Sequence, residues 1–164
     1  MVRKLLLLLG LVFVVSLTSH AQGFEVFGGY SFMHFDNSPD GNLNGWELSG
    51  QYKIAGPIGV VADFDGHYGS PDGLDTRVHT YLFGPQVSLP GRVSPFFHVL
   101  FGGAHTNVTG VGNSSFATAI GGGIDAKLGG PLYWRVIQGD YLHTSVFNRG
   151  QNNGRLSTGI VIKF

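Results

Sequence analysis

Cysteine is absent from the 164-residue sequence, which excludes disulfides, thiolate metal sites and thiol nucleophiles. Charge is scarce: Asp, Glu, Lys and Arg make up 12% of the residues, about half the roughly 25% of a soluble globular protein. The basic residues form no cluster outside the N-terminus, so we expect no nucleic-acid partner. Nucleotide-binding and zinc-protease motifs are also missing, and we expect no cofactor and no metal. The low charge indicates that something other than water solvates much of the surface.

The first 21 residues have the three parts of a secretory signal peptide. Arg3 and Lys4 precede an apolar stretch from Leu5 to Leu17, and Ser19-His20-Ala21 supplies the small residues that a signal peptidase accepts. An uncleaved membrane anchor needs about 20 apolar residues, and this stretch is shorter. We therefore predict a signal peptide over residues 1–21 and an exported domain over residues 22–164.

Downstream of the predicted signal peptide, apolar and polar residues alternate with a period of two. From Trp46 to Ile54 the even positions are apolar or small and the odd positions are polar, as expected for a strand with two different faces. Paired and tripled glycines, as in residues 121–123, argue against helices. The pattern predicts eight strands, over residues 24–35, 46–54, 58–68, 78–89, 93–105, 115–128, 132–147 and 155–164.

The connections between these strands alternate in length. Three are tight turns rich in glycine and proline, at residues 55–57, 90–92 and 129–131, and four are longer polar links, at residues 36–44, 69–76, 106–114 and 148–154. In an up-and-down meander the long links gather at one end and the short turns at the other, which is the asymmetry of outer-membrane barrels. Both chain ends then lie at the short-turn, periplasmic end.

A sheet that crosses lipid must close on itself, because an unpaired backbone group in hydrocarbon costs several kcal/mol. We therefore predict an all-β protein, an eight-stranded antiparallel up-and-down transmembrane β-barrel in the bacterial outer membrane. The alternative is a soluble barrel of the lipocalin type, in which the apolar face would point inward. The low charge content and the uneven loops favour the membrane barrel.

From Gln22 onward the sequence resembles the small outer-membrane barrel domains of the OmpA and OmpX type. The last strand carries Leu156, Thr158, Ile160 and Ile162 on one face and ends in Phe164, and residues 24–31 resemble the first strand of such barrels. The resemblance implies that Phe164 is a signal for the barrel-assembly machinery. OmpA proteins continue into a peptidoglycan-binding domain and this sequence does not, so we do not expect wall binding.

The polar face of the strands predicts a closed polar lumen, because eight strands leave room only for side chains. Charges packed there must pair. We expect Glu25 to lie near Lys163 at the periplasmic mouth, with Lys53 and Lys127 at the same level. The predicted inward charges are Glu25, Glu47, Lys53, Asp63, Asp65, Asp125, Lys127, Arg155 and Lys163.

The seventh predicted strand does not keep one phase. Arg135 is at an odd position, whereas Gln138 and Asp140 are at even ones. A bulge near Ile137 would turn all three inward. Alternatively, Arg135 extends outward to the periplasmic interface beside Tyr133.

Histidines and aromatic residues gather at the ends of the predicted strands. Five histidines, namely His34, His67, His79, His105 and His143, adjoin the long links, and we interpret them mainly as interfacial residues rather than metal ligands. Aromatic belts are predicted near the outer end at Phe32, Phe35, Trp46, Tyr68, Phe116, Tyr141 and Phe147, and near the inner end at Tyr52, Phe97, Tyr133, Trp134 and Phe164.

A lipid A deacylase is the enzyme that the sequence could suggest. His143 and Ser145 have the spacing of that family's His-x-Ser, but Val146 replaces the family's asparagine and no acidic residue follows Asp140. We therefore predict no catalytic residues and no enzymatic activity.

The sequence favours a monomeric barrel with a structural or surface-interaction role. Its predicted partners are outer-membrane lipid and lipopolysaccharide, the barrel-assembly machinery and an extracellular ligand held by the loops. The alternative function is narrow porin-like or OmpW-like passage of small solutes.

Overall fold

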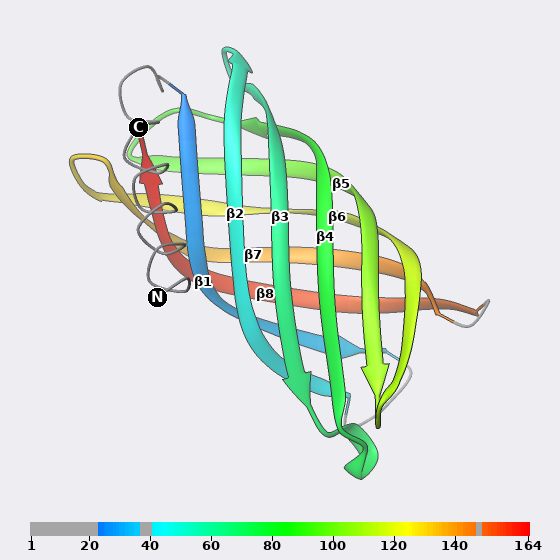
Figure 1. Ribbon diagram of the computed structural model, residues 1–164. Helices are drawn as coiled ribbons and strands as arrows, with labels where there is room; N and C mark the ends of the chain where they lie inside the picture. The colour runs from blue at the N-terminus through cyan, green and yellow to red at the C-terminus, as the bar shows by residue number, and fades with distance from the viewer. Residues whose placement is uncertain (1–22, 37–40, 147–148) are drawn as a thin grey trace, which may run out of the picture.

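In the computed structural model, residues 23–36, 41–146 and 149–164 are described, and they form a closed β-barrel (Figure 1). The strands are β1 (Phe24–Phe35), β2 (Asn42–Ala55), β3 (Ile58–Gly69), β4 (Thr76–Ser88), β5 (Val93–Val108), β6 (Val111–Gly129), β7 (Leu132–Val146) and β8 (Arg149–Lys163). Each strand pairs antiparallel with the next, and β1 also pairs with β8. The prediction of an eight-stranded up-and-down barrel is confirmed. The predicted signal peptide and Phe147 lie outside the described residues.

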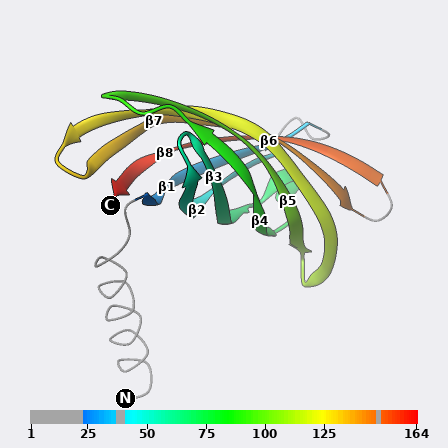
Figure 2. The same ribbon diagram turned by 90° about the horizontal axis from the view of Figure 1, so that it is seen from above.

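The two ends of the barrel differ in how the strands are joined. At one end lie the start of β1, the end of β8 and three short turns, each of which contains a glycine with positive φ: Gly56 at 54°, Gly91 at 147° and Gly130 at 53°. At the other end, β3 leads into a short 3₁₀ helix, η2 (Pro71–Gly73), before β4 begins (Figures 1 and 2). Within the described ranges, no helix is long and apolar enough to cross a membrane.

Two of the four predicted long links are wrong. In the segment 106–114, β5 and β6 stay paired up to Val108 and Val111, leaving the two-residue turn Thr109–Gly110. Likewise β8 begins at Arg149, and residues 149–154 pair with β7. These hairpins are polar on both faces and therefore lack the alternation that marks a strand in lipid. The other two links are shortened, because β2 begins at Asn42 and β4 at Thr76.

The barrel is apolar on the outside and filled on the inside. Large apolar and aromatic side chains cover its outer wall, for example Leu48, Phe83 and Ile160, which are between 42% and 51% exposed. The charged residues of the same strands, such as Glu47 on β2, are buried in the lumen. This is the reverse of a soluble barrel, and it is the arrangement that a surrounding of lipid tails requires. The barrel is therefore a transmembrane one.

The lumen holds both charged and apolar side chains. Charged residues gather at its middle and its short-turn end, and an apolar cluster runs from Val61 and Leu82 to Met33 and Leu43 near the hairpins, where His67, Thr144 and Asn153 are also buried. The apolar cluster consists of Met33, Phe35, Leu43, Val61, Val78, Leu82, Leu100, Ala104, Ala117, Ala119 and Leu142. The predicted polar lumen is thus only part of the interior. Phe35, predicted for the outer aromatic belt, belongs to this buried cluster, because it continues the inward phase of Phe27 and Met33.

A bulge in β7 settles the phase of that strand. The pairing of β7 with β8 shifts between Arg135 and Gln138, and Val136 and Ile137 are both exposed on the outer wall. Consequently Arg135, Gln138 and Asp140 are all buried in the lumen. Of the two interpretations left open by the sequence, the structure has the bulge.

Candidate functional site

The candidate site is the charged cluster at the centre of the lumen, and Arg155 of β8 is its hub. The guanidinium donates two parallel hydrogen bonds of 3.0 Å to the carboxylate of Asp63 and bonds of 2.9 and 2.6 Å to Asp140 Oδ2. It also donates to Asp65, and its Nε lies 3.7 Å from Glu47 Oε2. The side chains of all five residues are at most 1% exposed. One cation thus holds four carboxylates from β2, β3 and β7.

Neutral side chains complete the hydrogen bonding of these carboxylates. His98 Nε2 lies 2.7 Å from Asp140 Oδ1, and His67 lies between Asp65 and Ser31 at 3.2 and 2.9 Å. Thr80 donates a hydrogen bond of 2.5 Å to Asp65, and Ser157 donates one of 2.5 Å to Glu47. The amide of Gln138 donates to both Glu47 and Asp140, at 2.9 and 2.8 Å. Buried carboxylates are costly unless paired and hydrogen-bonded, and here each one is both.

A second charged cluster lies toward the short-turn end. Arg135 binds the Asp125 carboxylate with its Nε at 2.8 Å, while its guanidinium lies between the rings of Phe27 and Phe96, 4.3 and 4.2 Å from their centroids. Stacking on two aromatic faces suits a delocalised cation with little hydration. Lys163 lies 3.3 Å from Asp125 and therefore links this pair to the mouth of the barrel.

The mouth itself holds the predicted neighbours Glu25 and Lys163. Lys163 Nζ lies 3.4 Å from Glu25 Oε2, across the β1–β8 pairing that closes the barrel. Lys53 Nζ lies 2.6 Å from Glu25 Oε1, and its side chain is partly exposed at the rim. Glu25 is therefore shared by two lysines.

Lys127 lies at the rim of the mouth and not deep in the lumen, over the same Tyr133 ring as Lys163. Lys127 is exposed, with its Nζ 5.9 Å from the ring centroid of Tyr133. It shares the phase of buried Asp125, but it lies two residues closer to the turn after Gly129, beyond the part of the barrel that neighbouring strands enclose. The other eight predicted charges lie inside the lumen or at its rim, in two groups: Glu47, Asp63, Asp65 and Arg155 at the centre, and Glu25, Lys53, Asp125 and Lys163 toward the mouth.

Sequence reasoning missed the apolar cluster and the role of His98. Leu43 follows the same odd phase as Glu47 on β2, and Leu142 the same even phase as Asp140 on β7. Inward-facing positions such as these, on the hairpin side of the last charged residue of a strand, would have indicated the apolar cluster. His98 lies just before the middle of β5 and faces inward. Its position along the strand would have distinguished it from the histidines at the rim.

A glycine makes room for the central cluster. Gly121 of β6 pairs with Asp140, and a Cβ built on Gly121 would lie 1.9 Å from Asp140 Oδ1. A side chain there would displace the carboxylate that Arg155 and His98 hold. Glycine is therefore required for space at this position and not for a turn.

The histidines at the hairpin end do not form one site. His67 faces the lumen, whereas His34, His105 and His143 are exposed on the outer wall, each hydrogen-bonded through Nδ1 to a side chain of the neighbouring strand, at 2.7, 2.9 and 2.8 Å. His79 also points outward and packs edge-on against Tyr68. Among the side chains that the structure describes, no group of three or more His, Asp or Glu residues is arranged to hold a metal ion.

The His143 and Ser145 pair lacks an orienting carboxylate. Both side chains are exposed on the outer wall, and Asn152 occupies His143 Nδ1. Asp140 lies in the lumen, bound to Arg155 and His98, so it cannot orient His143. Without that third group the arrangement of a serine nucleophile is incomplete.

Phe164 lies where β8 returns to the start of β1. Its backbone N–H donates to the Phe24 carbonyl at 2.8 Å, and the two rings stack with centroids 6.3 Å apart. The ring is 42% exposed on the outer wall. It is therefore accessible from the membrane side at the short-turn end.

No protein-family model matches the sequence, and no curated protein matches it. Solved structures do match this chain. Neisserial surface protein A superposes with a TM-score of 0.67 over 87% of this chain and 97% of its own, at 16% identity. The outer membrane protein OprG from Pseudomonas aeruginosa has a TM-score of 0.55 over 87% and 98% of the two chains at 13% identity, and the Yersinia pestis outer membrane protein Ail, in a phospholipid bilayer nanodisc, has 0.53 over 87% and 99% at 18% identity. These chains share the closed barrel from end to end, and the apolar wall described above suits the bilayer in which such barrels lie. The chain has the fold of the small eight-stranded outer-membrane β-barrels.

Proposed function

We propose that this chain is a closed, non-conducting barrel with a structural or surface-interaction role in the outer membrane, and that it is not an enzyme. The observation that carries the proposal is the Arg155 cluster, in which one guanidinium and four carboxylates lie fully buried across the middle of the lumen. The apolar cluster of Met33, Leu43 and their neighbours adds a second barrier toward the hairpin end.

Passage of small solutes, the alternative, would have to disrupt both barriers. A charged solute would lose its hydration at the apolar cluster. An apolar solute would meet the Arg155 cluster, whose ion pairs would have to separate. The two clusters together therefore disfavour both kinds of solute.

The hairpins at the outer end are the parts of the barrel that suit a surface role. Paired strands extend to Val108 and Val111 on β5–β6, and β7–β8 forms a similar hairpin. Neisserial surface protein A, one of the structural neighbours, is named as a surface protein. We propose that these hairpins and not long loops contact an extracellular partner. We further propose that exposed Phe164 acts as the signal for the assembly machinery and that the barrel works as a monomer.

Conductance across a planar lipid bilayer tests the proposal. The purified barrel is inserted from proteoliposomes whose content of folded protein is first shown by its faster migration on an unheated detergent gel. We expect no current above that of the bare bilayer in high salt. Steady, salt-dependent current steps would refute the closed lumen and favour passage of solutes.

The absence of catalysis is tested on lipid A from cells that express the protein. We expect the mass spectrum of lipid A to be the same for the wild type, for Ser145→Ala and for cells without the protein. Loss of an acyl chain with the wild type but not with Ser145→Ala would show a hydrolase.

A further inference from the structure

A groove of about 470 Å³ lies at the outer end of β3 and β4. Its lining carries an aromatic ring, hydroxyl groups and charges of both signs. The lining residues are Tyr68, Gly69, Ser70, Asp75, Thr76 and Arg77. Nothing in the closed-lumen function uses these groups.

Arg77 sets this groove apart from the rest of the surface. Arg77 is exposed, pairs across the sheet with Tyr68, and forms no ion pair with the side chains that the structure describes. The other six described Lys and Arg side chains, namely Lys53, Arg92, Lys127, Arg135, Arg155 and Lys163, lie in the lumen or at the short-turn end. A free guanidinium on a membrane-facing wall offers two parallel hydrogen bonds to a phosphate group.

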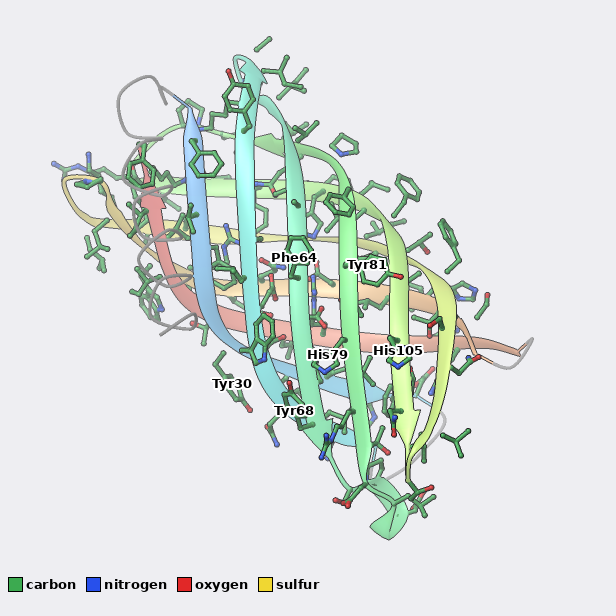
Figure 3. The ribbon with its side chains drawn as sticks, viewed as in Figure 1. Tyr30, Phe64, Tyr68, His79, Tyr81 and His105 are labelled. Carbon is green, nitrogen blue, oxygen red and sulfur yellow. The ribbon has the colours of Figure 1, made fainter. Side chains whose placement is uncertain are left out.

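Two histidines extend the row of donors next to Arg77. His79 follows Arg77 on the same outward phase, and His105 is its direct partner on β5. Figure 3 shows these two imidazoles side by side on the outer wall, with Tyr68 nearer the hairpin end. Tyr68 and His79 pack in a T-shaped arrangement with ring centroids 5.5 Å apart, which holds both rings in place.

The groove also contains groups that a bare phosphate would not need. Asp75 accepts a hydrogen bond from the Ser70 hydroxyl at 2.9 Å, and its carboxylate remains able to accept others. A carboxylate next to a phosphate site disfavours a purely anionic headgroup, but it suits hydroxyl or amide donors of a sugar. The apolar face of Tyr68 suits the ring of that sugar.

The wall directly below the groove is apolar. Phe64 and Tyr81 lie on the same outer face toward the middle of the barrel (Figure 3), and Phe64 packs edge-on against Phe83 with centroids 5.8 Å apart. Tyr81 and Phe83 are about half exposed. A ligand that fits the groove and this wall therefore has a phosphorylated sugar at its outer end and acyl chains below it.

We propose that the surface formed by Tyr68, Asp75, Arg77, His79 and His105 binds the phosphorylated sugar headgroup of an outer-leaflet glycolipid, of the lipid A type. Arg77 binds the phosphate, assisted by the imidazoles. Asp75 and Tyr68 bind the sugar, and the acyl chains lie over Phe64, Tyr81 and Phe83. The site rests on the transmembrane placement of the barrel, because it needs the outer wall to face lipid.

Native mass spectrometry of the intact barrel released from detergent tests this site. The probes are diphosphorylated lipid A, the same lipid A without phosphates, phosphatidylglycerol and soluble glucosamine phosphate. We expect lipid A to bind at least tenfold more tightly than each of the other three, because the site contacts the phosphate, the sugar and the acyl chains of the same molecule. Equal binding of phosphatidylglycerol or of dephosphorylated lipid A would overturn the proposal. Equal binding of the soluble sugar phosphate would overturn the lipid as the occupant, as would dimers that form through this face instead.

Three variants locate the binding. Arg77→Gln is expected to weaken lipid A binding about tenfold, whereas Arg92→Gln, which removes an exposed cation at the opposite end, should leave it unchanged. Asp75→Asn should weaken binding of lipid A and of its dephosphorylated form by the same factor. Faster migration of each variant on an unheated gel shows that it folds. Wild-type affinity of Arg77→Gln, or an equal loss with Arg92→Gln, would refute the site. Current in the planar bilayer would instead refute the closed lumen and leave this site standing, so the two failures are distinguishable.

Discussion

The guanidinium of Arg155 donates to the carboxylates of Asp63, Asp65 and Asp140 in an interior that the eight strands enclose. Substitution of this residue would leave these carboxylates and Glu47 without their shared cation. Removal of one partner of a buried ion pair costs more than the pair contributes, because the remaining charges are left without solvent. The stability of the barrel should therefore depend strongly on this one side chain.

Arg155→Met tests this dependence. Methionine keeps most of the length of the side chain and removes the charge, and we expect the free energy of unfolding to fall by about 3–5 kcal/mol. Urea unfolding in lipid vesicles, followed by circular dichroism and by gel migration, measures it. Arg92→Gln, at an exposed turn, serves as the matched control and should change the free energy by less than about 0.5 kcal/mol. A wild-type unfolding midpoint for Arg155→Met would contradict the account.

Gly121 and Gly154 offer a pair of matched substitutions in the strands. A Cβ on Gly121 would overlap the carboxylate of Asp140, whereas a Cβ on Gly154 meets nothing within 4 Å. We expect Gly121→Ala to lower the free energy of unfolding by about 1–3 kcal/mol through overpacking, and Gly154→Ala to leave it nearly unchanged. The same urea unfolding experiment compares them. Equal effects of the two substitutions would show that lumen packing is not the reason for Gly121.

At the scale of elements, the β5–β6 hairpin turns through two residues with positive φ, Thr109 at 49° and Gly110 at 89°. A two-residue turn with both φ angles positive favours Asn-Gly, and a β-branched residue is strained at its first position. Thr109 is therefore a poor residue for its own turn.

Thr109→Asn should relieve this strain. We expect the free energy of unfolding to rise by about 0.5–1 kcal/mol, seen as a higher urea midpoint in vesicles. Thr106→Asn, made in the paired part of the same hairpin, is the control and should not raise the midpoint. If Thr109→Asn gave no increase, or destabilised the barrel, the strained two-residue turn would be contradicted and the longer polar link that the sequence suggested for residues 106–114 would be favoured.

The sequence predicted the elements well where strands cross lipid and poorly where they leave it. β3 was predicted to within a residue, because lipid on one face and the lumen on the other impose alternation. The hairpin residues 106–114 meet water on both faces, so their polarity resembled a loop. The sequence left the β7 bulge as one of two alternatives and could not decide between them. The outcome depends on the contacts of Arg135 with Asp125 and two aromatic rings inside the lumen, which the sequence does not reveal.

At the scale of the whole molecule, eight strands close a barrel whose interior holds two charged clusters and an apolar cluster. The sequence indicated which charges face inward but not their partners, because contacts such as Arg155 with Asp63 join residues about ninety positions apart. Lys127 shows the limit of the periodic pattern. The pattern predicts whether a side chain faces the lumen or the lipid, but not how far the residue lies from the end of the barrel.

The orientation of the wall is the claim on which the membrane placement depends. The chain contains two tryptophans, Trp46 on β2 and Trp134 on β7, and both are 44% exposed on the outer wall. Fluorescence quenching in vesicles of brominated phospholipids tests this claim most directly, with lipids that carry bromine at different depths. We predict strong quenching of the emission by lipid-borne bromine and weak quenching by aqueous acrylamide. Efficient quenching by acrylamide with no effect of brominated lipid would contradict the account, because the apolar wall would then not face the acyl chains.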